Sequence, residues 1–215
     1  MANSLLVLAV AIATLFLTYG GSVNGCVVNI QNNCPFQVTG CSQTQTQDIA
    51  QYNLAAGGSA AVDLGGACSW PAAVVYASVT GQCAVSGQPA AATDRNLANL
   101  AEFTIGANGL DTYDLSNVNA YTIGLAINPS NSGCTSISCT IGDISGFCQP
   151  PNQLVTQPSS SQSCINTDGT NGIGPTDGTR QFKNACPTSY SYNFDDLTST
   201  FTCATGTDYT VVFCP

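Results

Sequence analysis

The cysteines are the residues of this chain whose chemistry is easiest to infer. The sequence of 215 residues contains twelve cysteines, and all of them lie after residue 25. An even number of cysteines in an exported chain predicts a complete set of disulfides, because an oxidising compartment favours their formation. We therefore expect six disulfide bonds among these positions: Cys26, Cys34, Cys41, Cys68, Cys83, Cys134, Cys139, Cys148, Cys164, Cys186, Cys203 and Cys214.

The composition excludes several other chemistries. The chain has no histidine, which excludes a Ser-His-Asp or Cys-His nucleophile and any His-ligated metal. No two cysteines have CxxC spacing, so we expect no metal and no cofactor. Three basic residues face twelve acidic ones, for a net charge of −9. Nucleic acid and anionic lipid need clustered Lys and Arg, whereas a surface of neutral polar residues suits carbohydrate.

The N-terminus has the pattern of a signal peptide. Leu5 to Leu17 is almost continuously apolar but too short to span a bilayer, which needs about 20 residues. Val23 and Gly25 fit the small-residue positions of a cleavage site, so we expect residues 1–25 to be removed before Cys26. The alternative is a buried N-terminal helix. The mature chain is expected to be a secreted, extracellular monomer of the apoplast or cell wall, without membrane insertion.

The rest of the sequence predicts an all-β fold. Short runs rich in Val, Tyr, Phe and Thr are separated by Gly, Asn and Asp, which favours an antiparallel β-sandwich or barrel. Apart from a possible helical turn at residues 97–100, no segment has a convincing helical period. Two further runs, 26–30 and 36–40, flank the turn cluster 32–35, and a hairpin there would place Cys26 opposite Cys41. The other expected strands are 59–64, 73–80, 100–105, 112–115, 121–127, 199–203 and 209–214.

Residues 134–186 differ in composition from the rest, because they are rich in cysteine, proline and glycine. They predict a loop-rich module held by disulfides. Thr167-Asp-Gly-Thr170 recurs here as Thr176-Asp-Gly-Thr179. A calcium loop would need alternating Asp or Asn ligands and a terminal Glu, which are missing, so we interpret the repeat as two turns.

Four stretches resemble one known family. They are Asn32-Asn33-Cys34-Pro35-Phe36, the pair Leu100-Ala-Glu-Phe-Thr-Ile105 and Asp111-Thr-Tyr-Asp-Leu-Ser116, the segment Phe182-Lys-Asn-Ala-Cys-Pro187 with the residues up to Cys203, and Tyr209-Thr-Val-Val-Phe-Cys-Pro215. Together they are similar to the signatures of the thaumatin-like family of pathogenesis-related proteins. The resemblance covers the whole mature chain, although the usual member of that family has sixteen cysteines.

The resemblance implies a thaumatin-like β-sandwich domain, 26–133 with 187–215, a loop-rich second domain, 134–186, and a cleft between them. It also implies the disulfides Cys34–Cys214, Cys134–Cys203 and Cys139–Cys186. Local proximity adds Cys68–Cys83 and Cys148–Cys164, which, together with Cys26–Cys41, uses all twelve cysteines.

The resemblance also implies the residues of the cleft, which in this family has one Arg, one Glu and three Asp. Glu102 and Asp114 match two of the acids, and Asp195 or Asp196 matches another. Asn119 stands where the third Asp is expected, and residues 75–81, where the Arg is expected, contain none. Tyr113, Tyr121, Phe103 and Trp70 could stack on sugar rings or pack in the core.

Three functions fit these residues. The first is a secreted defence protein, antifungal by family, that binds β-1,3-glucan or a related cell-wall polysaccharide in the cleft. The second is a weak endo-β-1,3-glucanase, since glycoside hydrolysis needs one protonated and one ionised carboxyl group, and Glu102 and Asp114 could supply them. The third is a non-catalytic protein ligand or enzyme inhibitor. The alternative for all the acidic residues is a structural role, in which they bind backbone N–H groups at the rim of the cleft and in its turns.

Overall fold

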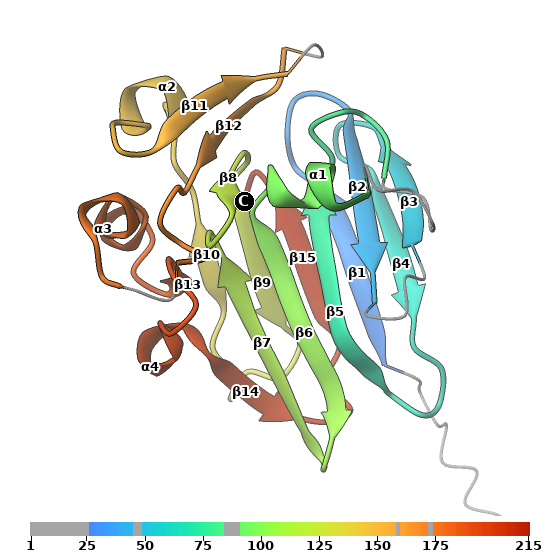
Figure 1. Cartoon of the computed structure of the whole chain (residues 1–215). Helices are drawn as coiled ribbons and strands as arrows, with labels where there is room; N and C mark the ends of the chain where they lie inside the picture. The colour runs from blue at the N-terminus through green and yellow to red at the C-terminus, as the bar shows by residue number, and fades with distance from the viewer. Residues whose placement is uncertain (1–25, 45–48, 84–90, 158–159, 172–173) are drawn as a thin grey trace, which may run out of the picture.

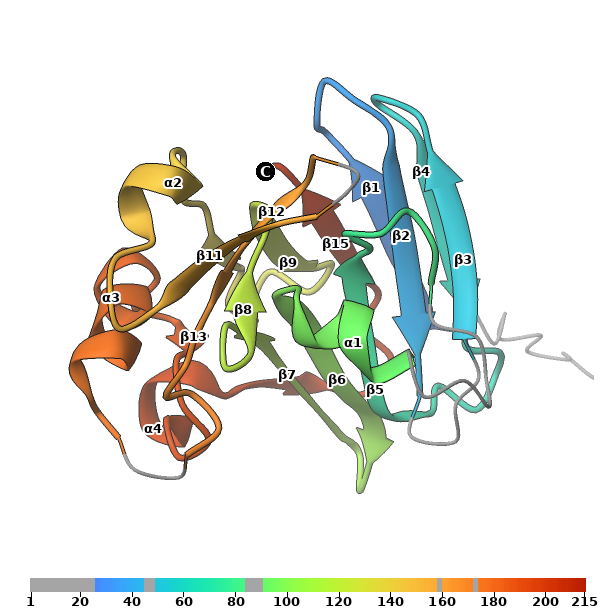
Figure 2. The ribbon, with the colours of Figure 1, turned by 45° about the horizontal axis from the view of Figure 1, so that its top comes forward.

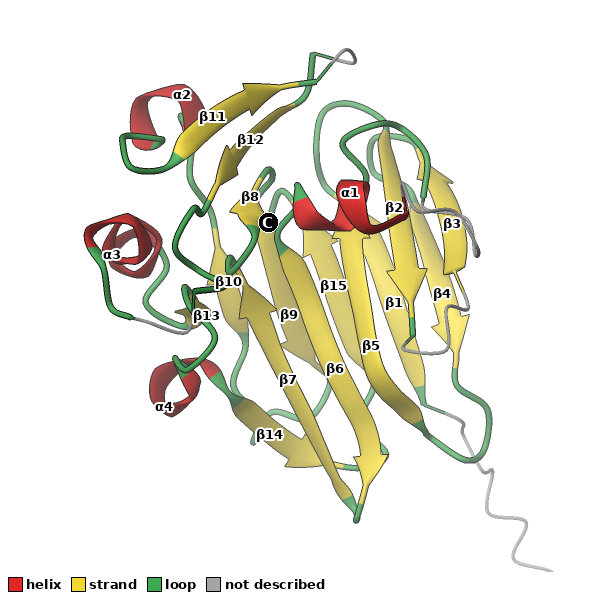
Figure 3. Cartoon of the chain, in the orientation of Figure 1, coloured by secondary structure: helices red, strands yellow, loops and turns green. Residues whose placement is uncertain are grey.

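The computed structural model describes residues 26–44, 49–83, 91–157, 160–171 and 174–215. The expected signal peptide therefore lies outside the described residues. Within them, strands dominate and helices are short (Figure 3). The strands are β1 Val27–Asn32, β2 Val38–Gln43, β3 Ile49–Leu54, β4 Ser59–Asp63, β5 Trp70–Ala77, β6 Leu100–Ala107, β7 Leu110–Ser116, β8 Ala120–Tyr121, β9 Leu125–Pro129, β10 Ile137–Cys139, β11 Gln153–Thr156, β12 Gln162–Ile165, β13 Ser189–Tyr190, β14 Phe201–Ala204 and β15 Tyr209–Phe213; the helices are α1 Ala91–Asn96, α2 Ile144–Phe147, α3 Asp177–Ala185 and α4 Asp196–Ser199.

Two sheets form the sandwich that the sequence predicts (Figure 1). One has the order β10-β9-β15-β1-β4, and the other has the order β13-β7-β6-β5-β2-β3, with β14 also paired to β7. All pairs are antiparallel except β1–β15 and β13–β7. Alternate residues of the two sheets point inward and bury each other, as the period of two in a strand requires. The core between them includes Val28, Ile30, Val75, Phe103, Tyr113, Tyr209, Val211 and Phe213.

The expected hairpin between residues 26–30 and 36–40 is wrong. β1 pairs with β4 and β15, whereas β2 lies in the other sheet between β3 and β5. The turn between them therefore joins the two sheets, and Cys26 and Cys41 do not face each other in one ladder.

Because β1 and β2 lie in different sheets, the cysteines near them pair differently from the expectation. The pairings Cys26–Cys41 and Cys68–Cys83 are wrong, because the structure joins Cys26 to Cys68 and Cys41 to Cys83. The other four expected bridges are present: Cys34–Cys214, Cys134–Cys203, Cys139–Cys186 and Cys148–Cys164. Cys41 reaches Cys83 because both belong to a small cluster on the outer face of the β2–β5 sheet, separate from the main core.

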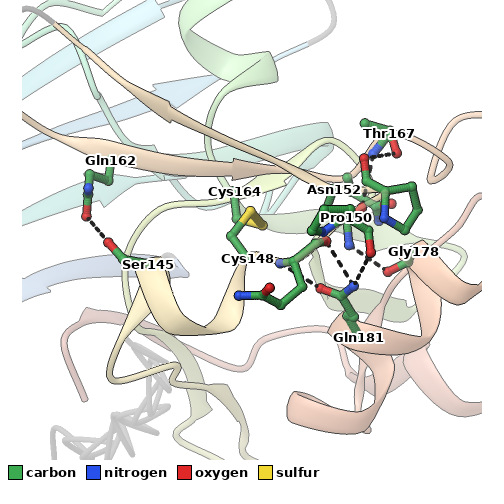
Figure 4. The surroundings of a disulfide bond; sticks show 12 residues. Ser145, Cys148, Pro150, Asn152, Gln162, Cys164, Thr167, Gly178 and Gln181 are labelled. Carbon is green, nitrogen blue, oxygen red and sulfur yellow. Dashed lines mark hydrogen bonds between the residues drawn. A yellow bond between two sulfur atoms is a disulfide. The ribbon is translucent and has the colours of Figure 1, made fainter.

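Of residues 134–186, β10 belongs to the first sheet of the sandwich, whereas α2, α3 and the β11–β12 hairpin lie on one side of the two sheets (Figure 1). The hairpin joins a small third sheet through β8. Side chains connect its parts around Cys148–Cys164: Gln181 of α3 donates to the carbonyl oxygens of Gln149 and Pro150, and Asn152 donates to that of Gly178 (Figure 4).

The helix α3, whose exposed face is polar, is not among the elements that the sequence predicts. Its first turn is the second copy of the Thr-Asp-Gly-Thr repeat, so the interpretation of that copy as a simple turn is wrong. Thr176 and Thr179 form a reciprocal capping box, in which each side chain satisfies a backbone N–H of the other. Within the described residues, no helix is long and apolar enough to cross a membrane.

Candidate functional site

The site is built on the central strands β6 and β7. Their register places Glu102 directly opposite Asp114. Residues opposite each other in an antiparallel pair project from the same face, with Cβ atoms about 5 Å apart. Phe103 and Tyr113 form the next facing pair of the ladder, and their side chains point to the other face and into the core. The two carboxyl groups are therefore neighbours on the outer face of the sheet.

A cleft of about 550 Å³ lies over these two residues. Its floor comes from the outer faces of β6 and β7, and its walls come from α1, the segment after β7, and the loops around β13 and α4. Most of the lining residues are polar. One basic and three acidic side chains carry charge, and the other lining residues are neutral. The polar lining residues are Arg95, Glu102, Thr104, Thr112, Asp114, Ser116, Asn119, Thr170, Tyr190, Asn193 and Asp196.

Arg95 gives the cleft a cation that the sequence comparison with the family did not reveal. No Arg occupies residues 75–81, but the Arg95 side chain enters the cleft from the end of α1. Its Nη2 lies 3.9 Å from Oε1 of Glu102, and both side chains are about one-third exposed. The contact is long and partly solvated, so it tunes the charge of Glu102 more than it stabilises the fold.

The environment raises the pKa values of both central acids. Burial raises the pKa of Glu102, while the Arg95 guanidinium and a hydrogen bond from Ser116 oppose the rise. Burial also raises the pKa of Asp114 well above its usual range, and the negative charges of Glu102 and Asp196 add to this shift. The pair therefore favours the protonated form of Asp114 over that of Glu102.

Asp114 has an unsatisfied oxygen. Its Oδ1 is buried and has no hydrogen-bond partner among the residues that the structure describes. Buried polar atoms normally have a partner, so the Asp114 carboxyl group keeps hydrogen-bonding capacity that the described residues do not use. Beside it, the hydroxyl of Tyr190 donates to Oδ1 of Asp196 at 2.8 Å. Burial, with help from the carboxyl groups of Asp196 and Asp114, raises the pKa of Tyr190 to about 12.

Two expected cleft residues lie elsewhere. Tyr113 is in the core, where its hydroxyl donates to the carbonyl oxygen of Thr135 at 2.6 Å. Asp195 is buried beside the cleft and accepts hydrogen bonds from the N–H and hydroxyl of Ser191, while Lys183 lies 2.9 Å away. Both corrections have a physical reason: strand alternation turns Tyr113 inward, and Lys183 fixes Asp195 in the wall. Asp196 and Asn119 do line the cleft.

The other candidate aromatics also belong to the core. Trp70 stacks on Phe103, the ring of Phe103 packs edge-on against Tyr209, and Tyr121 is buried. Phe103 borders the cleft although its ring packs in the core, and the lining also includes Tyr190, which was not expected there from the sequence. It lies in the motif Tyr190-Ser-Tyr192, so that motif was the available signal. Among the described residues, no group of three or more Cys, Asp or Glu side chains is placed to hold a metal ion.

Comparisons with known proteins agree on one family. The model of the thaumatin family matches residues 64–215. A thaumatin-like protein of Actinidia deliciosa is 36% identical over 212 residues, covering 89% of this chain and 90% of that protein. Pathogenesis-related protein 5 of Arabidopsis thaliana is 34% identical over 230 residues, covering 94% and 95%. A solved structure of the thaumatin-like xylanase inhibitor TLXI overlaps with a TM-score of 0.47 at 16% identity, covering 87% of this chain and 99% of that one.

Proposed function

Since this chain belongs to the thaumatin family, we propose that it is an exported defence protein whose acidic cleft binds a neutral cell-wall polysaccharide, with β-1,3-glucan as the first candidate. Membership of the family supports the defence role. Six disulfides, with no free cysteine among the described residues, are typical of exported proteins and support the extracellular location. The loop-rich segment 134–186 acts in this proposal as a second domain that contributes Thr170 to the cleft wall.

The unsatisfied Oδ1 of Asp114 is the observation that carries the proposal. An unpaired buried acceptor costs about 1–3 kcal/mol, and a donor from a ligand would recover that cost. Sugar hydroxyl groups are such donors, and they carry no charge that Arg95 or the three acids would repel. A protonated Asp114 could also donate to a sugar oxygen, so either protonation state suits a hydroxyl-rich ligand.

The rest of the cleft fits the same ligand. Hydroxyl and amide side chains surround the acids and offer both donors and acceptors, as small-molecule sites commonly do. The Tyr190 ring supplies an aromatic surface that suits the C–H face of a pyranose. A cleft of about 550 Å³ accommodates a short stretch of a polysaccharide chain.

Retention on insoluble β-1,3-glucan tests this function. We expect the wild-type protein to be retained above a control polysaccharide, and the paired variant Glu102→Gln with Asp114→Asn to be retained at least about tenfold less. Asp177→Asn is a matched control, because that carboxylate is 93% exposed on α3, away from the cleft. Equal retention of wild-type protein and the paired variant would show that the cleft does not bind β-1,3-glucan.

Weak hydrolysis of the same polysaccharide is a second candidate, and one observation favours it. Glu102 and Asp114 are neighbouring carboxyl groups whose environments differ, because Arg95 opposes protonation of Glu102 while Glu102 and Asp196 favour protonation of Asp114. Asp114 would then act as the general acid, and Glu102 as the ionised partner. Release of reducing ends from laminarin would be lost in both Asp114→Asn and Glu102→Gln; unchanged release in either variant excludes this mechanism.

A further inference from the structure

A second hollow, the upper groove, lies between the start of β2 with the end of β5 and the β11–β12 hairpin. Its volume is about 480 Å³, and it shares no lining residue with the acidic cleft. Figure 2 shows the hairpin reaching across towards the end of the sandwich where β2 begins. The lining residues come from the start of β2, the end of β5, the segment after β8, α2 and β12: Phe36, Gln37, Val38, Thr39, Ala77, Ser78, Val79, Gly81, Thr122, Ile123, Ile144, Ser160, Ser161 and Gln162.

The segment 94–99 contributes to one hollow and holds lining residues of the other. On the cleft side it presents Arg95. On the groove side, Oδ1 of the buried Asp94 accepts from the backbone N–H groups of Val79 and Thr80, at 3.1 and 3.0 Å. The buried Asn99 donates to the carbonyl oxygen of Ile123 at 2.8 Å and accepts from the N–H of Thr122. Two walls of the upper groove are thus held by buried polar side chains.

The hairpin wall is held in a similar way. The hydroxyl of Thr122 donates to the carbonyl oxygen of Gln162 at 2.7 Å, which joins the hairpin to the segment after β8. The hydroxyl of Ser145, from α2, donates to Oε1 of Gln162 at 3.2 Å (Figure 4). The groove therefore lies between fixed elements, and a ligand would meet a largely preformed surface.

Phe36 stands exposed at the mouth of the upper groove. Its side chain is a large apolar group with 55% exposure. Its backbone is fixed, because Nδ2 of the buried Asn32 donates to the carbonyl oxygen of Phe36 at 2.8 Å, and Cys34, two residues earlier, is bonded to Cys214. An exposed aromatic ring on a fixed backbone offers a flat apolar surface to a ligand in the groove.

The chemistry of the lining restricts the ligand. None of its residues is charged, so the groove has no counter-ion for phosphate, an acidic peptide or a basic peptide. Its polar groups are the hydroxyl and amide side chains of Gln37, Thr39, Ser78, Thr122 and Gln162, with those of Ser160 and Ser161. A chain of neutral hydroxyl groups with apolar C–H faces matches both these groups and the Phe36 ring.

We propose that the upper groove is a second carbohydrate site, in which Phe36 stacks on one ring of a neutral sugar chain and the hydroxyl and amide side chains of the groove bind its hydroxyl groups. The site goes beyond the proposed function, because it uses none of the acidic residues and does not depend on binding in the cleft. With both sites occupied, one molecule could contact two stretches of an insoluble polymer, which raises the apparent affinity for that polymer.

Nuclear magnetic resonance titration of the oxidised, isotope-labelled protein tests the proposal. The probes are hexasaccharides of β-1,3-glucose, β-1,4-glucose and β-1,4-xylose, each added alone. We expect at least one of them to give saturable shifts in the backbone signals of Thr39, Ser78, Thr122 and Gln162. These signals report on the upper groove, whereas those of Glu102 and Asp114 report on the cleft, so the two sites are scored separately in one experiment.

Variants at Phe36 separate ring stacking from general apolar contact. Phe36→Tyr keeps the flat ring and should keep the affinity at the groove signals. Phe36→Leu keeps an apolar side chain without the ring and should weaken that affinity roughly three- to tenfold. Phe194→Leu is the matched control, since Phe194 is also exposed but does not line the groove. All these positions are exposed, so the variants are expected to fold.

Three results would overturn the proposal. The first is the absence of saturable shifts at the groove signals with all three hexasaccharides. The second is equal affinity of Phe36→Leu and wild-type protein at those signals. The third is saturable binding of an uncharged peptide at the groove with no response to any sugar, which would make the groove a peptide site. None of these outcomes depends on the behaviour of Glu102 or Asp114.

Discussion

The two faces of the β6–β7 pair carry buried acids with opposite fates. On the inner face, Oδ1 of Asp111 accepts from the N–H of Gly106 and the hydroxyl of Thr205, each at 2.9 Å, and Oδ2 accepts from the hydroxyl of Tyr209 at 3.0 Å. On the outer face, Oδ1 of Asp114 is buried without a partner among the described residues. The two aspartates are three positions apart on the same strand.

Burial alone therefore does not separate a structural acid from a functional one. Satisfied hydrogen bonds do, because a carboxylate surrounded by protein donors has nothing left to offer a ligand. The adjacent Asp195 and Asp196 differ in position instead. Asp195 is held by Ser191 and Lys183 inside the wall, whereas Asp196 lines the cleft and accepts a hydrogen bond from Tyr190 there.

The largest expected effect comes from Asp111→Ala. Removing this carboxylate leaves the N–H of Gly106 and the hydroxyls of Thr205 and Tyr209 without their acceptor in or near the core. We expect the free energy of unfolding to fall by about 3–5 kcal/mol, measured by urea denaturation. Asp114→Ala, the matched variant on the outer face, should change stability by less than about 1 kcal/mol. Similar losses for both would erase the distinction between the two faces.

Lys183→Met tests the wall on which Asp195 lies. Nζ of Lys183 contacts Oδ2 of Asp195 at 2.9 Å and also donates to the carbonyl oxygen of Ser189 and the hydroxyl of Ser199. Breaking a largely buried pair should cost about 2–3 kcal/mol of stability by thermal unfolding. Arg180→Met breaks a pair of the same α3 helix that is mostly exposed and should cost under about 0.5 kcal/mol. The wall is not fixed by Lys183 if the two variants unfold alike.

Asp114→Asn tests whether the Asp114 carboxyl group stabilises or destabilises the folded protein as the pH changes. The folded-state pKa of Asp114 lies above its unfolded value, so the folded protein binds the proton more tightly. Its contribution therefore favours the fold at low pH and is lost as pH rises from the unfolded value through the folded one. Asn carries no such charge, so we expect the stability of the variant relative to wild type to rise between pH 3 and pH 7, measured by urea denaturation at both pH values. A fall in that relative stability between the two pH values would contradict the raised pKa.

The smallest effect on stability is expected from Arg95→Gln. Because the Arg95–Glu102 pair is long and partly exposed, its removal should change the free energy of unfolding by under about 0.5 kcal/mol. The pKa of Glu102 should nevertheless rise, since the guanidinium holds it down in the wild-type protein. A carbon-detected NMR titration of the Glu102 carboxyl group measures this, and an unchanged pKa would show that Arg95 does not act on the cleft.

Much of the fold follows from local sequence patterns, whereas the sheet assignments do not. Runs such as 59–64, 100–105 and 209–214 become β4, β6 and β15 because alternating apolar residues bury one face of each strand. A turn signal, however, does not say whether its strands share a sheet. The turn at Asn32 to Pro35 joins different sheets, and the error in the pairing of Cys26 and Cys41 follows from that one assumption.

The site divides in the same way. The facing of Glu102 and Asp114 is a consequence of strand alternation and register, and alternation also predicts that Tyr113, next to Asp114, turns inward. The positions of Arg95 and Tyr190 depend on how α1 and β13 lie over the sheet. That arrangement is set by tertiary packing, so the motif Tyr190-Ser-Tyr192 could mark Tyr190 as a candidate but could not place it in the cleft, and no local pattern marks Arg95.

The carboxyl carbon signals of Asp114 and Asp111, followed during titration with a β-1,3-glucan hexasaccharide, test the central claim most directly. If the sugar satisfies the unpaired oxygen of Asp114, its signal should move saturably while that of the fully bonded Asp111 stays in place. If the Asp114 signal does not move at sugar concentrations that saturate the protein, or if no saturation occurs, the acidic cleft is not a sugar site.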